Sequence, residues 1–305
     1  MNYGITEAQK NDIIENWGQD IFLKTRQELE IYSKRWDLSD LEFFEHYSIN
    51  LIFFCKSEIH GDCVLKIGGD SQDYEFAAEY RVLREYGGRR YVRVYEADID
   101  IPARRKVMLI ERVFPGVPLE NEQSLEKRLA VFSELFKGLH IEPENPGVYI
   151  SYAEFIDNDA ENCLRENAGK GNAKILLRHI SRARELYSEL TGKYNQEMLL
   201  HIDLYWGNIV SSGEGSYRIV DPKGVIGDPI FEMGQNLLEE CFKYEGQPEN
   251  IELIFNYFEK SLSIPNRVLR EVFYIENVRF VCECNDGLDE GDIERLEFAE
   301  KVMGG

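Results

Sequence analysis

The sequence predicts an α+β protein with two lobes: a small N-terminal antiparallel β-sheet with a crossing helix, and a larger, mostly helical C-terminal lobe. Three observations lead to this prediction. Apolar β-rich runs alternate with polar turns and one helical stretch up to residue 113. Pro115, Gly116 and Pro118 then mark a hinge, and beyond it apolar residues recur at spacings of three and four. We therefore expect lobes over residues 1–113 and 114–305.

The N-terminal lobe begins with a helical extension, because apolar residues in the first forty positions recur at helical spacing. They are Ile13, Ile14, Trp17, Ile21 and Phe22. The run "INLIFFCKSEIHGDCVLKIGG" contains two apolar segments around a polar turn at Gly61, which predicts a β-hairpin. The stretch "YEFAAEYRVLREYGG" predicts a helix that ends at Gly87, and "RYVRVYEADID" and "RKVMLIERVF" predict two more strands.

The C-terminal lobe is predicted from three long segments with helical periodicity: "SLEKRLAVFSELFKGLH", "NAKILLRHISRARELYSELTGKY" and "PENIELIFNYFEKSLS". Two short apolar runs interrupt them, "MLLHIDLYWGNIV" and "YRIVDPKGV". Each of these runs ends in polar residues, so we expect short strands that carry functional side chains at their ends.

Composition limits the classes of partner. The formal net charge of −21 disfavours nucleic acid and anionic membranes as partners. No basic start precedes an apolar run, and no stretch approaches about 18 uninterrupted apolar residues, so we expect a cytoplasmic protein without a membrane span. The six cysteines are scattered and lack zinc-finger spacing, which favours reduced thiols.

Five polar residues have the chemistry that phosphoryl transfer requires. Asp203 and Asn208 lie in the polar part of "LLHIDLYWGNIV", and Asp221 follows the next short strand. A carboxylate beside the attacking hydroxyl and oxygen ligands for a hard divalent cation are both needed in that reaction. Upstream, Lys66 ends a predicted strand and Glu79 lies on the following helix, so the two can form an ion pair that places an ammonium group on ATP phosphates.

The order of these motifs resembles the aminoglycoside phosphotransferase family, and most closely its streptomycin 6-kinase and hydroxyurea phosphotransferase branch. The motifs are V-L-K, a helical Glu, L-I-E-R, H-x-D-L-x-x-x-N and D-P-K-G-x-x-G-D-P, and "IVDPKGVIGDPIFEMG" is the most specific. The resemblance runs from about residue 36 to about residue 240 and implies a bilobal protein-kinase-like fold. It also implies ATP and Mg²⁺ as cofactors, with GTP as the alternative nucleotide.

Residue roles follow from the resemblance at matching positions. Asp203 is expected to orient or deprotonate the acceptor hydroxyl, and Asn208 and Asp221 to hold magnesium. Lys66 is expected to contact the α- and β-phosphates, with Glu79 holding Lys66.

Further positions have supporting roles by the same resemblance. His201 is expected to be a structural residue of the catalytic loop, and Asp228 the buried aspartate that braces this loop. In "HYSIN", Ser48 and Asn50 would cover the phosphates. Glu111 and Val113 would line the adenine pocket through backbone groups.

The acceptor side departs from the family pattern. Ile202 stands where the family usually has Gly, and Tyr205 where it has His or Asn. Tyr205 and Trp206 could stack on an acceptor or simply pack in the core. Lys223 could lie near the phosphates, pair with an acid, or be solvated.

The C-terminal segment "ECNDGLDEGDIE" supplies candidate acceptor ligands Glu283, Asp286 and Asp289, which would suit a cationic acceptor; a solvated helix connection is the alternative. The predicted function is ATP- and Mg-dependent phosphotransfer to a hydroxyl of an aminoglycoside-like or other small acceptor. The alternatives are a kinase for choline or a sugar, and a catalytically silent nucleotide-binding or scaffold protein.

Overall fold

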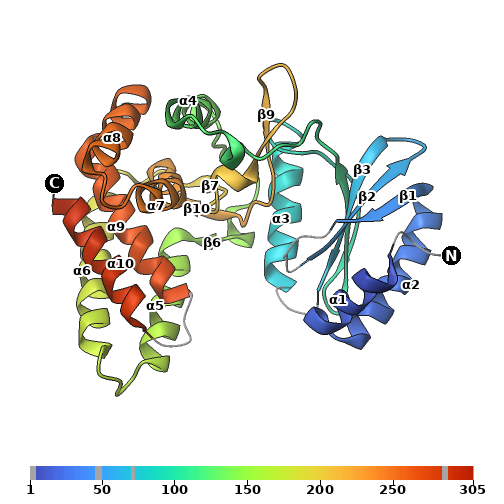
Figure 1. Ribbon diagram of the computed structural model, residues 1–305, viewed down its shortest axis with the longest axis horizontal. Helices are drawn as coiled ribbons and strands as arrows, with labels where there is room; N and C mark the ends of the chain where they lie inside the picture. Colours follow the sequence, from blue (N-terminus) through green and yellow to red (C-terminus); the bar gives the residue numbers. More distant parts are fainter. Residues whose placement is uncertain (1–4, 45–49, 70–72, 284–287, 305) are drawn as a thin grey trace. The chain divides into compact units, whose positions relative to one another are not determined.

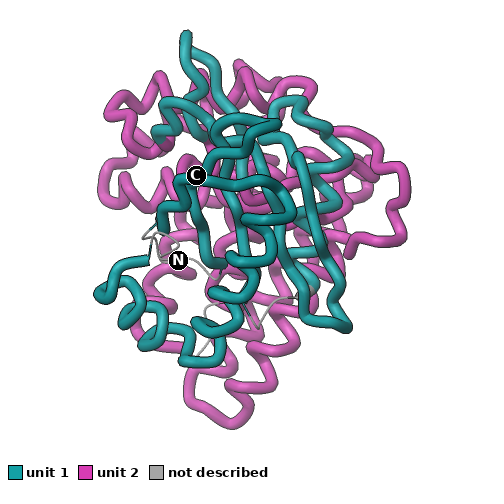
Figure 2. The backbone as a smooth tube through the Cα atoms, turned by 90° about the vertical axis from the view of Figure 1, so that its right-hand side faces the viewer, with its two compact units in different colours: residues 1–117, 210–220 teal, residues 118–209, 221–305 magenta. Residues whose placement is uncertain are grey.

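A computed structural model describes residues 5–44, 50–69, 73–283 and 288–304 (Figure 1). The chain divides into two compact units. Unit 1 comprises Met1–Val117 and Val210–Val220, and unit 2 comprises Pro118–Ile209 and Asp221–Gly305 (Figure 2). Unit 1 carries an antiparallel sheet and unit 2 is mostly helical, which confirms the predicted α+β class.

The sheet of unit 1 has five strands in the order β1-β2-β3-β5-β4, with antiparallel neighbours. Its strands are β1 (Leu38–Phe43), β2 (Asn50–Ser57), β3 (Gly61–Gly68), β4 (Val94–Asp100) and β5 (Arg105–Glu111). The predicted hairpin is formed by β2 and β3, which turn at Gly61, where φ is +75°. Glycine adopts such a positive φ without the steric cost that a β-carbon adds.

Helices cover both faces of this sheet (Figure 1). On one face, α1 (Glu7–Trp17) and α2 (Gln19–Arg35) contribute Ile13, Phe22 and Leu29 to a buried cluster that also contains strand residues such as Phe53 and Leu65. On the other, α3 (Asp73–Tyr86) contacts β4 and β5. Because side chains alternate across a strand, the neighbours of Leu65 along β3 point toward α3.

The segment Val210–Val220 returns to unit 1 through backbone hydrogen bonds. It contains most of β8 (Ile209–Ser211) and all of β9 (Tyr217–Ile219), which pair with each other. Ser211 N–H donates to Val117 O at 2.9 Å, and Val92 N–H donates to Ile219 O at 3.1 Å.

Unit 2 is organised around α9 (Asn266–Glu283), which contacts five other helices. These are α5 (Tyr152–Glu166), α6 (Ala173–Thr191), α7 (Met233–Lys243), α8 (Pro248–Leu262) and α10 (Glu290–Gly304). The remaining long helix, α4 (Leu125–Phe136), packs on α8. Among the residues described, no helix is both long and apolar enough to cross a membrane.

A three-stranded sheet in unit 2 carries the polar loops predicted from the sequence. Its order is β6 (Ile150–Ser151), β10 (Val225–Gly227), β7 (Met198–Leu200), with β10 parallel to β6 and antiparallel to β7. The loop after β7 contains His201 to Asn208, and the turn before β10 contains the segment 221–224. Pairing of β7 with β10 therefore brings the two motifs together.

Candidate active site

The strand lysine and the helix glutamate predicted to pair do so in unit 1. Lys66 on β3 places Nζ 2.9 Å from Oε1 and 2.8 Å from Oε2 of Glu79 on α3. Only 3% of Lys66 and 5% of Glu79 are exposed, so both charges are removed from water. A buried charge requires a partner of this kind, and the pair fixes the ammonium group at one position on the sheet.

The other described residues predicted to bind the nucleotide in unit 1 lie at strand ends or just beyond them. Asn50 begins β2 and pairs with Gly68, and Glu111 ends β5. The Glu111 carboxylate accepts the Arg93 N–H at 3.1 Å, and Val113 is half-buried. Ser48 lies outside the described residues.

In unit 2, a buried carboxylate holds the loop that follows β7. Glu232 Oε2 accepts the His201 N–H at 2.8 Å, and Glu232 Oε1 accepts the Ile202 N–H at 2.7 Å. His140 Nε2 lies 3.2 Å from the same carboxylate. Burial opposes ionisation, but the hydrogen bond and charge of His140 and the nearby His201 leave the pKa of Glu232 below its ordinary value.

The bracing role predicted for Asp228 is therefore carried by Glu232. Asp228 is buried, as expected, but its oxygens accept the N–H groups of Ile230 and Gln196, both at 3.1 Å. It caps the short helix η4 (Pro229–Glu232). The helical turn that Asp228 starts is what carries Glu232 to the loop.

Ile202 adopts a left-handed backbone conformation, with φ of +63°. Such a conformation is unfavourable for a β-branched residue. The glycine that the resemblance predicts at this position would adopt the same φ without that cost. Here the hydrogen bond to Glu232 and the burial of the isoleucine side chain hold the strained residue in place.

Asp203 is half-buried and is fixed through its backbone. Its N–H donates to His201 Nδ1 at 3.1 Å, and its carbonyl accepts Asn208 Nδ2 at 2.8 Å. His201 is fully buried, which agrees with a structural role. Burial raises the pKa of the Asp203 carboxyl, while the charges of Lys223 and His201 act in the opposite direction.

The segment 221–224 is tied to this loop by one backbone bond, from Lys223 N–H to His201 O at 3.1 Å. Asp221 has φ of +54°, a conformation that Asp tolerates better than most residues. Two loops of unit 2, joined by this hydrogen bond, thus carry Asp203, Asn208, Asp221 and Lys223.

These donors fit a magnesium ion better than a metal held by protein alone. In the described part of the chain, no three His, Cys, Asp or Glu side chains are grouped to hold a metal. Asn208 donates its amide nitrogen to the Asp203 carbonyl, which leaves its amide oxygen available as a ligand, and Asp221 on the second loop carries a carboxylate. One or two protein oxygens, completed by water and phosphate oxygens, are the usual magnesium environment.

The predicted acceptor residues separate into different environments. Glu283 Oε1 lies 3.3 Å from Lys223 Nζ, and Glu283 Oε2 lies 2.8 Å from Arg279 Nη1, so both oxygens are engaged. Asp289 is exposed; its N–H donates to Asp292 Oδ2, and its Oδ1 accepts the Asp292 N–H at the start of α10. Asp286 lies outside the described residues.

Trp206 is a core residue, which settles one of the open alternatives. It is 1% exposed and packs edge-on against Phe132, with ring centroids 5.7 Å apart. Tyr205 is half-buried and folds over Gly207, where a β-carbon would lie 2.4 Å from the tyrosine ring. Burial, then the nearby Asp203 carboxylate, raise the pKa of Tyr205 to about 12.

A half-buried carboxyl near Tyr205 was not among the predicted site residues. Burial raises the pKa of Glu239 to about 7, against the effect of a hydrogen bond from the Trp206 backbone. Its Oε2 has no hydrogen-bond partner among the described atoms. Glu239 lies on α7, beyond the resembling motif, and a Glu on a helix carries no sequence signal of its own.

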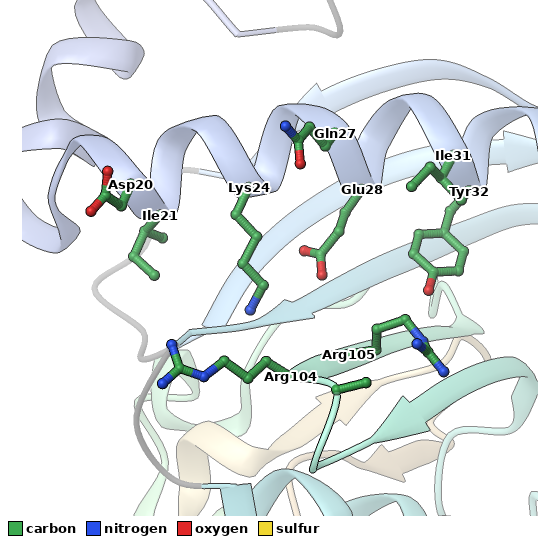
Figure 3. A pocket seen from close by; sticks show the side chains of 10 residues that line it. Asp20, Ile21, Lys24, Gln27, Glu28, Ile31, Tyr32, Arg104 and Arg105 are labelled. Carbon is green, nitrogen blue, oxygen red and sulfur yellow. The ribbon is translucent and has the colours of Figure 1, made fainter.

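A cavity of about 390 Å³ lies elsewhere, between α2 and the turn joining β4 to β5 (Figure 3). Lys24 and Glu28 of α2 point toward the turn that carries Arg104. The lining mixes both signs of charge, and none of its residues is a predicted site residue. No residue of the Asp203 loop lines this cavity.

Comparison with known proteins agrees with the motifs. The aminoglycoside/hydroxyurea antibiotic resistance kinase family matches residues 38–281. Streptomycin 6-kinase of Streptomyces griseus is 24% identical over 153 residues, a match that covers 50% of this chain and 47% of that protein. The chain thus spans about half the length of this curated relative.

Solved structures share the fold at low identity. Choline kinase from Streptococcus pneumoniae has a TM-score of 0.67 at 14% identity, covering 92% of this chain and 99% of that one. Plasmodium vivax ethanolamine kinase has a TM-score of 0.67 at 12% identity, and the match covers 100% of this chain and 95% of that one. A thermostable mutant of an aminoglycoside phosphotransferase, in complex with ADP and hygromycin B, has a TM-score of 0.61 at 13% identity. The match covers 90% of this chain and 96% of that one. The unit 1 sheet and helical unit 2 are therefore those of the protein-kinase-like fold.

Proposed function

Since the chain belongs to the aminoglycoside/hydroxyurea antibiotic resistance kinase family, we propose that it transfers the γ-phosphate of ATP to a hydroxyl of a small molecule. One observation carries the proposal. The Asp203 loop and the 221–224 segment are joined by the hydrogen bond from Lys223 N–H to His201 O, and Asp203 is half-buried on that loop. This arrangement supplies a base and two magnesium ligands on one rigid support.

Each residue then has one chemical task. Lys66, held by Glu79, binds the α- and β-phosphates. Asn208 and Asp221 hold magnesium, which neutralises phosphate charge when it is bound. Asp203 orients the acceptor hydroxyl and takes its proton as the oxygen attacks. Positioning and charge stabilisation provide most of the rate, because the loose transition state needs little covalent help.

The acceptor is proposed to be a small, cationic alcohol. The relative named above is a streptomycin kinase, and the similar folds include kinases for choline and ethanolamine and an enzyme bound to hygromycin B. Glu239 and the carboxylates around Tyr205 favour an ammonium group near the Asp203 loop.

A mass-spectrometric screen tests the function. The protein is incubated with ATP, magnesium and a panel that includes streptomycin, hygromycin B, choline and ethanolamine. One acceptor is expected to gain about 80 daltons, the mass of one phosphoryl group, and EDTA is expected to abolish the gain. Full ATP binding with no transfer to any hydroxyl compound in a broad panel would support a silent nucleotide-binding protein instead.

A further inference from the structure

Lys223 is held by both its backbone and its side chain. Its N–H donates to His201 O at 3.1 Å, which fixes its Cα beside the Asp203 loop. Its Nζ lies 3.3 Å from Glu283 Oε1, and the side chain is 28% exposed. The ammonium group therefore lies at the boundary between the buried interior of unit 2 and solvent.

The partner of Lys223 is itself fixed by a buried guanidinium. Arg279 is only 2% exposed and donates Nη1 to Glu283 Oε2 at 2.8 Å. It also donates Nε and Nη2 to Glu276 Oε1, at 2.9 and 2.7 Å, and Nη1 to Asp159 Oδ2 at 3.1 Å. All three guanidinium nitrogens of Arg279 donate hydrogen bonds, which fix the orientation of its side chain. The bond from Nη1 in turn orients the Glu283 carboxylate.

The network is more elaborate than burial of Arg279 requires. Glu276 and Asp159 already provide carboxylates for the guanidinium. Glu283 adds a third and directs its second oxygen to Lys223. The Arg279–Glu276 core of the network is buried, and buried ion pairs cost desolvation energy and often give no more stability than apolar packing. The network is therefore better explained by what it positions, which is the ammonium of Lys223.

We propose that Lys223 is a catalytic residue that contacts the phosphoryl group during transfer, and that Glu283 and Arg279 are its positioning residues. The inference rests on the proposed function. The acceptor oxygen forms a bond to the γ-phosphorus as its proton passes to Asp203, and the bond from that phosphorus to the bridging oxygen of ADP breaks. An oxygen poised for attack lies about 3–3.5 Å from phosphorus, so a cation beside Asp203 can reach the equatorial oxygens.

Under this proposal Glu283 does not bind the acceptor. Its oxygens serve Lys223 and Arg279, and the ammonium it holds faces the reacting group. The proposal replaces the acceptor-binding role expected for Glu283 with one of alignment.

The test uses steady-state kinetics with magnesium ATP and streptomycin, hygromycin B, choline and ethanolamine as probe acceptors. Variants are Lys223→Met, Lys223→Arg, Glu283→Gln and Asp203→Asn. Glu300→Gln is the control, because Glu300 pairs with Arg178 in an exposed ion pair of unit 2. Thermal unfolding and ATP affinity are measured for every variant.

Lys223→Met is expected to lower kcat about 100-fold with KM for ATP within about threefold of wild type. Lys223→Arg should recover part of the loss, and Glu283→Gln should lower kcat about tenfold. If Lys223 were only structural, Lys223→Met would lower the unfolding temperature and would not lower kcat while leaving KM for ATP unchanged. If Lys223→Met and Glu283→Gln keep wild-type kcat while Asp203→Asn is inactive, this proposal is overturned and the kinase function stands. If Asp203→Asn is also as active as wild type, both fail.

Discussion

The carboxylate of Glu232 accepts the backbone N–H of Ile202 at 2.7 Å and holds that residue at φ of +63°. The adjacent His201 N–H is bound by the second oxygen of the same carboxylate. One buried side chain thus sets the path of the backbone immediately before Asp203. The position of the proposed base depends on this contact.

Replacing Glu232 with Gln should loosen the loop. Glutamine keeps the volume but presents an NH₂ group to one of two backbone donors, so we expect unfolding free energy to fall by about 2–4 kcal/mol. Chemical denaturation at pH 7 measures the loss. Glu300→Gln, at an exposed ion pair, should change it by less than about 1 kcal/mol. Equal unfolding free energies for Glu232→Gln and Glu300→Gln would show that the two hydrogen bonds to the Glu232 carboxylate do not stabilise the fold.

The same residue makes a prediction about pH. The folded-state pKa of Glu232 is lowered from its ordinary 4.5, so its ionised form stabilises the fold above that value. The stabilisation is expected to disappear as the pH falls from 4.5 through the lowered pKa. The stability difference between wild type and Glu232→Gln should shrink over that interval. A difference that widened on acidification would contradict the assignment.

Ile202 allows a test of backbone strain. Both Ile202→Gly and Ile202→Ala remove a buried side chain, but only glycine relieves the left-handed conformation. We expect both to be destabilised, with the Gly variant more stable than the Ala variant by about 1 kcal/mol. Urea unfolding of the two proteins measures the order. The usual order, with Ala the more stable, would mean that the residue is not strained.

Lys66 and Glu79 should behave as a coupled pair. Lys66→Met or Glu79→Leu alone removes one half of this buried ion pair and leaves the other charge buried, and each is expected to cost about 3–5 kcal/mol. The double variant should be more stable than the sum of the single losses predicts. ATP affinity should fall in Lys66→Met and in the double variant alike, because the ammonium is absent from both. Additive stability losses would argue against the observed ion pair.

Much of this arrangement could be predicted because its signals are local. Strand alternation puts Lys66 on the face opposite Leu65, and helical periodicity puts Glu79 on the face of α3 that meets it. Spacing alone also identifies Asp203 and Asn208 as members of one loop. Strand pairing, visible as two apolar runs, joins that loop to the segment that carries Asp221.

The remainder depends on contacts distant in sequence. Glu232 meets a loop about thirty residues earlier, and Arg279 meets Asp159 of α5, which is 120 residues away, so no spacing marks either contact. The resemblance predicts the bracing role for Asp228 because Asp228 belongs to the D-P-K-G-x-x-G-D-P motif. Glu232 follows that motif and has no sequence signal of its own. Trp206 illustrates the opposite case: an aromatic beside a reactive loop belongs to the core, since it packs on Phe132.

The central claim, that Asp203 is the base of a phosphotransfer reaction, is tested most directly by comparing turnover and nucleotide affinity in Asp203→Asn. With the acceptor identified by the mass screen, kcat is expected to fall by about a thousandfold or more, while the calorimetric Kd for magnesium ATP changes by less than about threefold. Asp157→Asn, at an exposed ion pair with Arg184, should keep wild-type turnover. Wild-type turnover in Asp203→Asn would contradict the account.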